Sequence, residues 1–176
     1  MLILIRLYKS CILPLLECSS QVWNPYLKKD ICKIESVQKL FTRMVYYRSL
    51  PDPAYPRSLP SYQERLRNLG LKSLFYRRLL SDLFLGFKIL RGEVRLRASD
   101  LWTFRPVHIR RACFNITCPI RTRKLHSPLE NSFATRASVI LNKLPAELIS
   151  VRNSSQLRRL LRNVNLLELL NIEDVS

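Results

Sequence analysis

Basic side chains are the groups of this sequence best suited to hold a ligand, and several gather on one predicted helix over residues 30–47. At 100° per residue they lie along one side of that helix. Ammonium and guanidinium groups in such a stripe suit the phosphate groups of a polyanion, which they contact without reading a base sequence. The predicted phosphate contacts in and just before this helix are Lys28, Lys29, Lys33, Lys39 and Arg43.

The other side of the same helix is apolar and is predicted to face a core. Its side chains fall between about 60° and 160° from Lys29; they are Ile34, Val37, Phe41, Met44 and Val45. Asp30 is expected to cap the helix start, because a carboxylate can accept from the free amides of a first turn. The pattern fits equally well an ordinary amphipathic helix whose charged side is merely solvated.

A second group of basic residues lies in the segment 93–128, where aromatic residues are interleaved with them. Basic plus aromatic composition is typical of a surface on which single-stranded nucleic acid stacks. The other interpretation is an irregular loop whose aromatic side chains anchor it to the core. The predicted phosphate contacts of this second patch are Arg110, Arg111, Arg121, Arg123 and Lys124.

Catalytic and metal chemistry are not indicated. The aspartates are far apart in the sequence, so no pair is predicted to hold two metal ions. A zinc site is the weaker interpretation of two histidines and two cysteines whose spacing matches no common ligand pattern, namely His108, Cys113, Cys118 and His126. We therefore expect no metal, no cofactor and no enzymatic activity of this chain by itself.

The composition limits the class of partner. The chain has 176 residues and a formal net charge of +17, which favours nucleic acid but also suits an anionic membrane or an acidic protein. The odd number of cysteines indicates free thiols in a reducing, intracellular compartment, nuclear or cytoplasmic. The apolar start of the chain is interrupted by Arg6, Lys9 and Pro14 before it reaches spanning length, so no membrane span is predicted.

The periodicity predicts a mainly α fold with helices over 2–18, 30–47, 73–91 and 132–142 and one final helix from Ser154 or Ser155. A capping box at Ser61–Glu64 opens a further short helix that Gly70 closes. One short β-hairpin is expected around 107–117. The expected segments are helices over 1–48, a Pro-rich linker over 49–60, a helical hairpin over 61–92, a basic irregular segment over 93–128 and C-terminal helices over 129–176.

Several blocks of the sequence carry a resemblance to a known family. In order, the blocks are Leu7–Ser10, Leu13–Glu17, Ser20–Pro25, Ile34–Lys39, Tyr62–Leu66, Leu69–Leu71, Ser73–Arg78, Asn131–Phe133, Arg136, Asn142 and Leu144–Pro145. Together they resemble the region that follows the catalytic palm in reverse transcriptases of LINE-like non-LTR retrotransposons. The similarity covers almost the whole chain. Cys18 stands where that family usually has Tyr, and Leu141 where it often has Trp.

The resemblance implies a thumb, which in that family grips the primer–template duplex beside the palm. The chain starts after the palm would have ended and lacks the Tyr-x-Asp-Asp signature and the endonuclease region, so no polymerase activity follows. The first hypothesis is a fragment that binds RNA, DNA or an RNA–DNA hybrid through phosphates, with the missing palm as another partner. The alternatives are a basic module for acidic protein or membrane surface, and a non-functional relic that folds poorly.

Overall fold

The protein is described by a computed structural model that covers residues 2–49, 58–104, 116–118, 128–162, 164–172 and 174. These residues are mainly helical, with one short two-stranded antiparallel sheet, which confirms the expected fold class. The chain divides into two compact units. The first comprises Met1–Arg78 with Asp174–Ser176, and the second comprises Leu79–Glu173.

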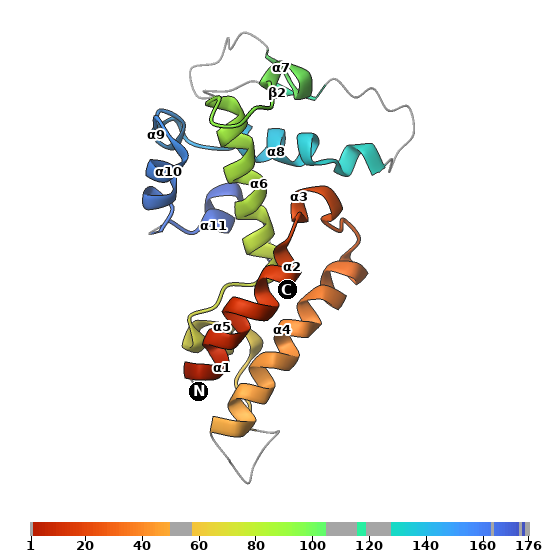
Figure 1. The fold of residues 1–176 in the computed structure, drawn as a ribbon, viewed down its shortest axis with the longest axis vertical. Helices are drawn as coiled ribbons and strands as arrows, with labels where there is room; N and C mark the ends of the chain where they lie inside the picture. The colour runs from red at the N-terminus through yellow and green to blue at the C-terminus, as the bar shows by residue number, and fades with distance from the viewer. Residues whose placement is uncertain are drawn as a thin grey trace. The chain divides into compact units, whose positions relative to one another are not determined.

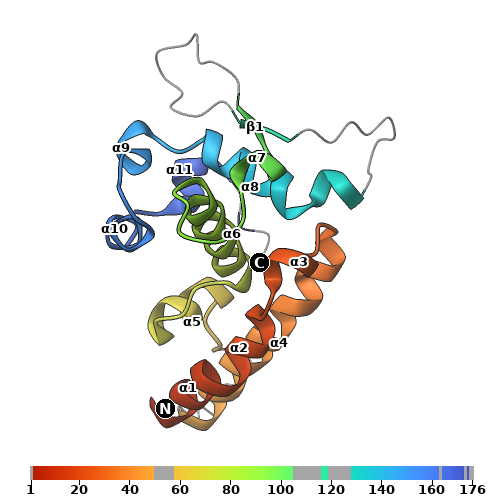
Figure 2. The ribbon, with the colours of Figure 1, turned by 45° about the horizontal axis from the view of Figure 1, so that its top comes forward.

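The first unit is built on two long helical segments that lie side by side (Figures 1 and 2). One is nearly continuous and consists of α1, the π-helix η1 and α2; the other is α4. The elements are α1 (Leu2–Leu7), η1 (Tyr8–Ile12), α2 (Leu13–Glu17), α3 (Ser20–Trp23), α4 (Lys28–Ser49), α5 (Tyr62–Leu69) and the first residues of α6 (Leu74–Leu90).

The first helical segment matches the predicted helix over 2–18 but contains a π turn rather than a simple bend at Pro14. Pro14 has no N–H to donate to a carbonyl one turn earlier. The turn before it is widened, and the Leu13 N–H donates to the Tyr8 carbonyl. The chain therefore remains helical up to Glu17 without an intrahelical bond from Pro14.

Apolar side chains from all parts of this unit form its core. Tyr8 and Phe41 stack face to face across the two long segments, with ring centroids 4.0 Å apart and an interplanar angle of 11°. The buried core residues are Ile5, Tyr8, Leu13, Phe41, Val45, Leu66, Leu69, Leu71 and Leu74. The start of α6 is therefore packed into the same core as α4.

A buried carboxylate ties α4 to the start of α6. Glu35 is fully buried, and its carboxylate accepts hydrogen bonds from the backbone N–H groups of Leu74 and Phe75 at 3.1 and 3.3 Å. These amides belong to the first turn of α6, which has no intrahelical acceptor for them. The Tyr62 hydroxyl donates a third bond, at 2.5 Å. Glu35 thus satisfies the start of another helix from within the core.

Gln38 extends this buried network to the first helical segment. The Tyr8 hydroxyl donates to Gln38 Oε1 at 2.9 Å. The Gln38 amide nitrogen donates to the Tyr62 hydroxyl and to the Lys72 carbonyl, each at 3.0 Å. We call Tyr8, Glu35, Gln38 and Tyr62 the buried polar network. It links η1, α4, α5 and α6 through bonds whose angles also fix the rotation of each helix.

The predicted local signals around α5 and α6 are confirmed. Ser61 Oγ accepts from the Glu64 N–H at 3.3 Å, and the Ser61 N–H donates to Glu64 Oε2 at 2.8 Å. Gly70 ends α5 with a φ of 60°, in the left-handed region that favours glycine. Ser73 Oγ caps α6 by accepting from the Tyr76 N–H at 3.2 Å, and Ser73 also donates to Asp174.

The predictions for α4 need two corrections. The helix begins at Lys28, so Asp30 lies within the first turn and is not the N-cap. The buried side is also rotated by about 70° from the predicted one. Val37 and Met44 are exposed, whereas the buried residues of α4 are Ile31, Glu35, Gln38, Phe41, Thr42 and Val45. The helix has this rotation because the side chains of Glu35, Gln38 and Thr42 have hydrogen-bond partners in the interior of the unit.

Two arginines near the start of α6 bond to other residues of the first unit. Arg77 forms a two-bond ion pair with Glu17. Arg78 is fully buried, and its Nε donates to Asn24 Oδ1 at 2.9 Å. These contacts use the planar geometry of guanidinium, which holds a carboxylate or amide oxygen in a fixed orientation.

The second unit begins within α6 and continues with short elements. Its two strands pair with Thr103 opposite Thr117 and Phe104 opposite Ile116, so one strand lies before the predicted range of 107–117. The elements are α7 (Ala98–Leu101), β1 (Thr103–Phe104), β2 (Ile116–Thr117), the 3-10 helix η2 (Pro128–Asn131), α8 (Phe133–Asn142), α9 (Ala146–Ile149), α10 (Ser154–Leu160) and α11 (Leu166–Leu170).

Within this unit, α8 packs closely on α6, which it crosses in Figure 1. A Cβ at Gly86 would lie 3.1 Å from Leu141 Cδ1 and 3.3 Å from Ala137 Cβ, so the missing side chain permits the approach. The nearly buried Asp82 pairs with Arg136 at 2.8 Å. The Leu141 position, where the resembled family often has Trp, is fully buried.

Two side-chain to backbone contacts join α8 to the segment that carries the small sheet. The Asn142 side chain bonds both the N–H and the carbonyl of Ile116, at 3.0 and 2.8 Å, and so continues the edge of β2. The buried Trp102 donates its indole N–H to the Ala134 carbonyl at 2.8 Å. Both contacts hold the small sheet against α8.

The predicted final helix is in fact two. α10 ends at Leu160 and α11 begins at Leu166, with Asn153 and Asn165 as the N-caps, whose side chains accept from Gln156 and Leu167. In α10, Leu157 is fully buried and Leu160 is exposed. Asn165 explains the break between α10 and α11, because its side chain caps the start of a new helix.

Replacing Glu35 with Ala should lower the free energy of unfolding by roughly 3 kcal/mol, because two backbone N–H groups and one hydroxyl lose their buried acceptor. Chemical denaturation followed by circular dichroism measures the change. The matched control is Ser36→Ala, at the exposed neighbouring position, which should cost less than about 0.5 kcal/mol. Equal losses in the two variants would contradict this role of Glu35.

Asp82 and Arg136 should behave as one unit. Each single change to Ala should cost roughly 3 kcal/mol, since it leaves the other charge in a largely buried place. The double variant should cost no more than the worse single one, and a double-mutant cycle from thermal or denaturant unfolding measures this coupling. Losses that simply add would show that the two side chains stabilise the fold independently.

Candidate nucleic-acid interface

Four of the five predicted basic residues of α4 are exposed. These four are Lys28, Lys29, Lys33 and Arg43. From Lys29 to Arg43 the helix axis rises by about 21 Å at 1.5 Å per residue. That length matches roughly six phosphates of one strand. The surface is therefore long enough to contact several phosphates at once.

Two of the predicted contacts have partners within the protein. Lys33 Nζ lies 3.8 Å from Asp30 Oδ1, and both side chains are well exposed, so this pair adds little stability and can open. Lys39 is half-buried, with its Nζ 5.1 Å from the centre of the Tyr62 ring. Lys39 therefore lies at the border with α5, while the other four predicted residues of α4 are freely accessible.

The second predicted patch cannot be placed. Arg110, Arg111, Arg121, Arg123 and Lys124 lie outside the described residues. The same holds for three of the four residues of the weaker zinc interpretation, all except Cys118. Within the described ranges, no group of three or more His, Cys, Asp or Glu side chains is placed to hold a metal ion. The cysteines found there as free thiols are Cys11, Cys18, Cys32 and Cys118.

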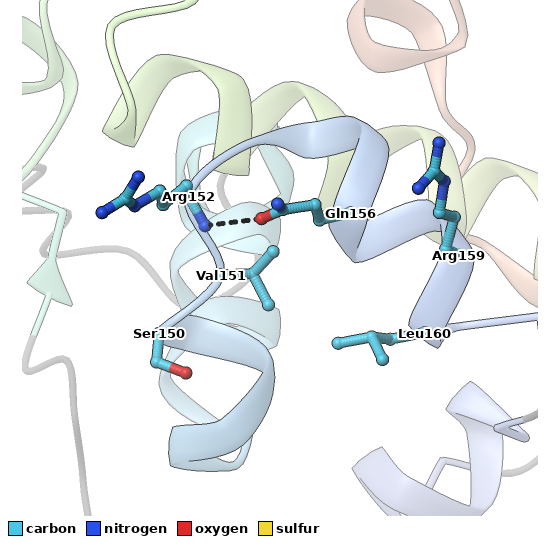
Figure 3. A pocket seen from close by; sticks show the side chains of 6 residues that line it. All are labelled: Ser150, Val151, Arg152, Gln156, Arg159 and Leu160. Carbon is cyan, nitrogen blue, oxygen red and sulfur yellow. Dashed lines mark hydrogen bonds between the residues drawn. The ribbon is translucent and has the colours of Figure 1, made fainter.

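The second unit has a shallow hollow of about 570 Å³ between α9 and α10. It is lined by Ser150, Val151, Arg152, Gln156, Arg159 and Leu160. Figure 3 shows the guanidinium groups of Arg152 and Arg159 at opposite ends of the hollow, and the Arg152 N–H bonded to Gln156. Because the two guanidinium groups do not converge, the hollow adds positive charge but no built anion site.

Burial changes the acidity of two hydroxyls in the buried polar network. Removal from water raises the pKa of Tyr62, and the hydrogen bond and charge of Glu35 raise it further. Burial likewise raises the pKa of Tyr8. Both hydroxyls are therefore protonated at neutral pH and act as hydrogen-bond donors.

Two exposed glutamates have a pKa below the ordinary value because each accepts hydrogen bonds from a serine. Ser61 donates to Glu64 within the capping box, and Ser154 donates to Glu93 at the start of α10. Hydrogen bonds to the charged form favour that form. These carboxylates stabilise helix starts and take no part in the basic surface.

The polar residues that hold α4 in place were missed by the sequence reasoning. Glu35, Gln38 and Thr42 are spaced by three and four residues, which places them on one side of a helix. Polar residues at that spacing normally indicate a solvated face. The signal that could have revealed them is their position beside the apolar Ile31, Phe41 and Val45 on the same side.

Comparisons with known proteins identify no family. No family model and no solved structure matches the chain. An uncharacterized protein of Caenorhabditis elegans is 34% identical over 88 residues, which cover 50% of this chain and 41% of that protein. The chain thus matches about two fifths of the length of this curated relative. The resemblance to reverse transcriptases stays a prediction. Separately, no described helix is long and apolar enough to cross a membrane.

The stability of the fold should fall as the pH rises above 10. The unfolded chain releases the Tyr8 and Tyr62 protons near the ordinary value of 10.0, whereas the folded chain keeps them. The folded state then binds more protons, so the free energy of unfolding decreases with pH. Urea unfolding at neutral pH and at about pH 11 measures the decrease.

The control for this pH effect is Tyr62→Phe, which removes one of the two hydroxyls. The variant should be less stable than the wild type at neutral pH, because Glu35 and Gln38 lose a partner. It should then lose less additional stability at high pH. The same decrease in both proteins would show that Tyr62 does not contribute to the pH dependence.

Proposed function

We propose that the chain is a thumb-like fragment of a LINE-like retrotransposon reverse transcriptase that binds nucleic acid through its phosphates. The observation that carries the proposal is the exposed line of Lys28, Lys29, Lys33 and Arg43 on one long helix. We call these four residues the basic surface. The proposal assigns no catalytic residue to this chain, because polymerase chemistry requires a palm with paired aspartates.

The physical basis of binding is counterion release. Each phosphate neutralised by a lysine or arginine frees condensed cations, so the affinity falls steeply with salt. A helix held by a buried polar network keeps its charges at fixed spacing, which reduces the ordering needed on binding. Phosphate contacts position a duplex without selecting its sequence. The expected ligand is therefore DNA, RNA or an RNA–DNA hybrid of any sequence.

The resemblance supports this assignment through the residues that carry it. Glu35 and Gln38 belong to the block Ile34–Lys39, and Tyr62 belongs to the block Tyr62–Leu66. These side chains meet in the buried polar network, and the amide of Leu74, from the block Ser73–Arg78, bonds to Glu35. The order of these blocks thus corresponds to one set of contacts that fixes the helix with the basic surface.

The proposal is tested by reversing three charges with Lys29→Glu, Lys33→Glu and Arg43→Glu in one variant. The affinity for an RNA–DNA hybrid should fall at least about tenfold at physiological salt. The slope of log affinity against log salt should become shallower by about 2 to 3, since up to three phosphate contacts are lost. Fluorescence anisotropy of a labelled hybrid over a series of salt concentrations measures both quantities.

A matched control carries the same charge change elsewhere. Arg152→Glu, Arg159→Glu and Arg162→Glu alter three exposed arginines of the second unit. This variant should keep most of its affinity and slope if α4 holds the main contacts. Equal losses of affinity in both triple variants would contradict the assignment to the basic surface, because binding would then follow net charge alone. No loss in either variant would contradict it as well, because these residues would then not contact nucleic acid.

A further inference from the structure

The outward side of α4 carries an apolar stripe in addition to its charges. Four of its residues are exposed although they are apolar: Val37 by 40%, Leu40 by 68%, Met44 by 37% and Tyr47 by 61%. They run from the middle of the helix toward its C-terminal end, whereas Lys28, Lys29 and Lys33 precede them. The apolar stripe is thus a separate part of the same face.

The spacing of these four residues is that of a helix–helix seam. They follow one another at intervals of three, four and three residues, which is the repeat of the apolar positions in a coiled coil. At 100° per residue they fall within about 80°, and along the axis they cover about 15 Å. The buried residues Glu35, Gln38 and Thr42 lie on the opposite side, so α4 has a second apolar edge beyond the one in the core.

The charges beside this stripe are positive. Arg43 lies on one side of it and Arg48 on the other, at the positions that flank a coiled-coil seam, and both are exposed. Lys33 continues the line toward the helix start. The acidic residues of α4 are Asp30 in its first turn and Glu35, which is buried. A ligand that covers the stripe therefore meets arginine on both flanks.

We propose that the stripe Val37, Leu40, Met44 and Tyr47 docks an amphipathic helix of a protein partner whose apolar residues are flanked by glutamate or aspartate. The apolar side chains of the partner would pack between these four residues as knobs into holes. Its carboxylates would pair with Arg43 and Arg48, which sets the orientation and excludes basic helices. We call these four residues the docking stripe.

A helix fits this surface better than nucleic acid does. A phosphate backbone would pair with the arginines but would leave the apolar side chains without apolar contacts. An acidic amphipathic helix would cover the apolar side chains and pair with the arginines at the same time. The inference does not depend on the proposed function, because three of the four residues of the basic surface, Lys28, Lys29 and Lys33, precede the apolar stripe, and Arg43 alone is shared by the two surfaces.

The test uses the full chain and two synthetic helical peptides of three heptads. Both have leucine at the seam positions; one has glutamate and the other lysine at the flanking positions. Like charges on the flanks keep each peptide from pairing with itself. Fluorescence anisotropy should show the glutamate peptide binding at least about tenfold more tightly than the lysine peptide.

Variants of the chain separate the docking stripe from the basic surface. Leu40→Ser with Met44→Ser should weaken the glutamate peptide at least about tenfold and change the affinity for an RNA–DNA hybrid by less than about twofold. Arg43→Glu with Arg48→Glu should reverse the preference toward the lysine peptide. Leu2→Ser with Ile3→Ser, two exposed apolar residues of α1, is the control and should change neither affinity.

The proposal fails if both peptides bind equally or if the Leu40 and Met44 changes leave peptide affinity unaltered. It also fails if neither peptide binds and the Leu40 and Met44 changes abolish binding to the RNA–DNA hybrid or to anionic lipid vesicles. The docking stripe would then be a binding site for nucleic acid or for lipid. Because Leu40 is 68% exposed and Met44 37%, the thermal midpoint of this variant should fall only modestly, and circular dichroism verifies that the variant is folded.

Discussion

The carboxylate of Glu35 holds the first unit together in a way that no apolar contact could replace. It accepts the Leu74 and Phe75 amides at the start of α6 and the Tyr62 hydroxyl, all in the interior. A buried carboxylate is costly unless its oxygens are satisfied, and helix amides without acceptors are costly too. The amides satisfy the carboxylate and the carboxylate satisfies the amides, while the positive end of the α6 dipole adds to the attraction. The position of α6 relative to α4 within this unit follows from these bonds.

The same bonds determine what α4 presents to the outside. Hydrogen bonds are directional, so Glu35 and Gln38 fix the rotation of the helix about its axis as well as its position. Had the most apolar side been buried, Val37 and Met44 would lie in the core. Because the polar residues are buried instead, Val37 and Met44 are exposed beside Leu40 and Tyr47. Both the basic surface and the docking stripe therefore depend on the buried polar network.

The sequence predicts the parts of this fold that depend on neighbouring residues. The capping box at Ser61 and Glu64 and the left-handed Gly70 are short-range devices, and they lie where the pattern predicts them. The rotation of α4 could not be predicted in this way, because the acceptors and donors of Glu35 come from residues 62, 74 and 75. Arg78 is a similar case, since its partner Asn24 is far away in the sequence.

For the candidate site, four of the five basic residues predicted on α4 are exposed and Lys39 is half-buried, whereas the prediction that the apolar and charged faces are opposite is wrong. The exposed Leu40 and Tyr47 show that the two kinds of residue share one face. A helical periodicity identifies which residues lie together, but not which side is covered. That choice is made by tertiary hydrogen bonds, here those of Glu35, Gln38 and Thr42.

Amide hydrogen exchange at Leu74 and Phe75 tests the role of Glu35 most directly. Amides in the first turn of a helix normally exchange quickly, because no carbonyl of their own helix accepts from them. If Glu35 holds them in the core, both should exchange as slowly as the central amides of α4, through unfolding of the unit. Exchange at the rate of an exposed amide at these two positions would contradict the account, since α6 would then begin without a buried acceptor.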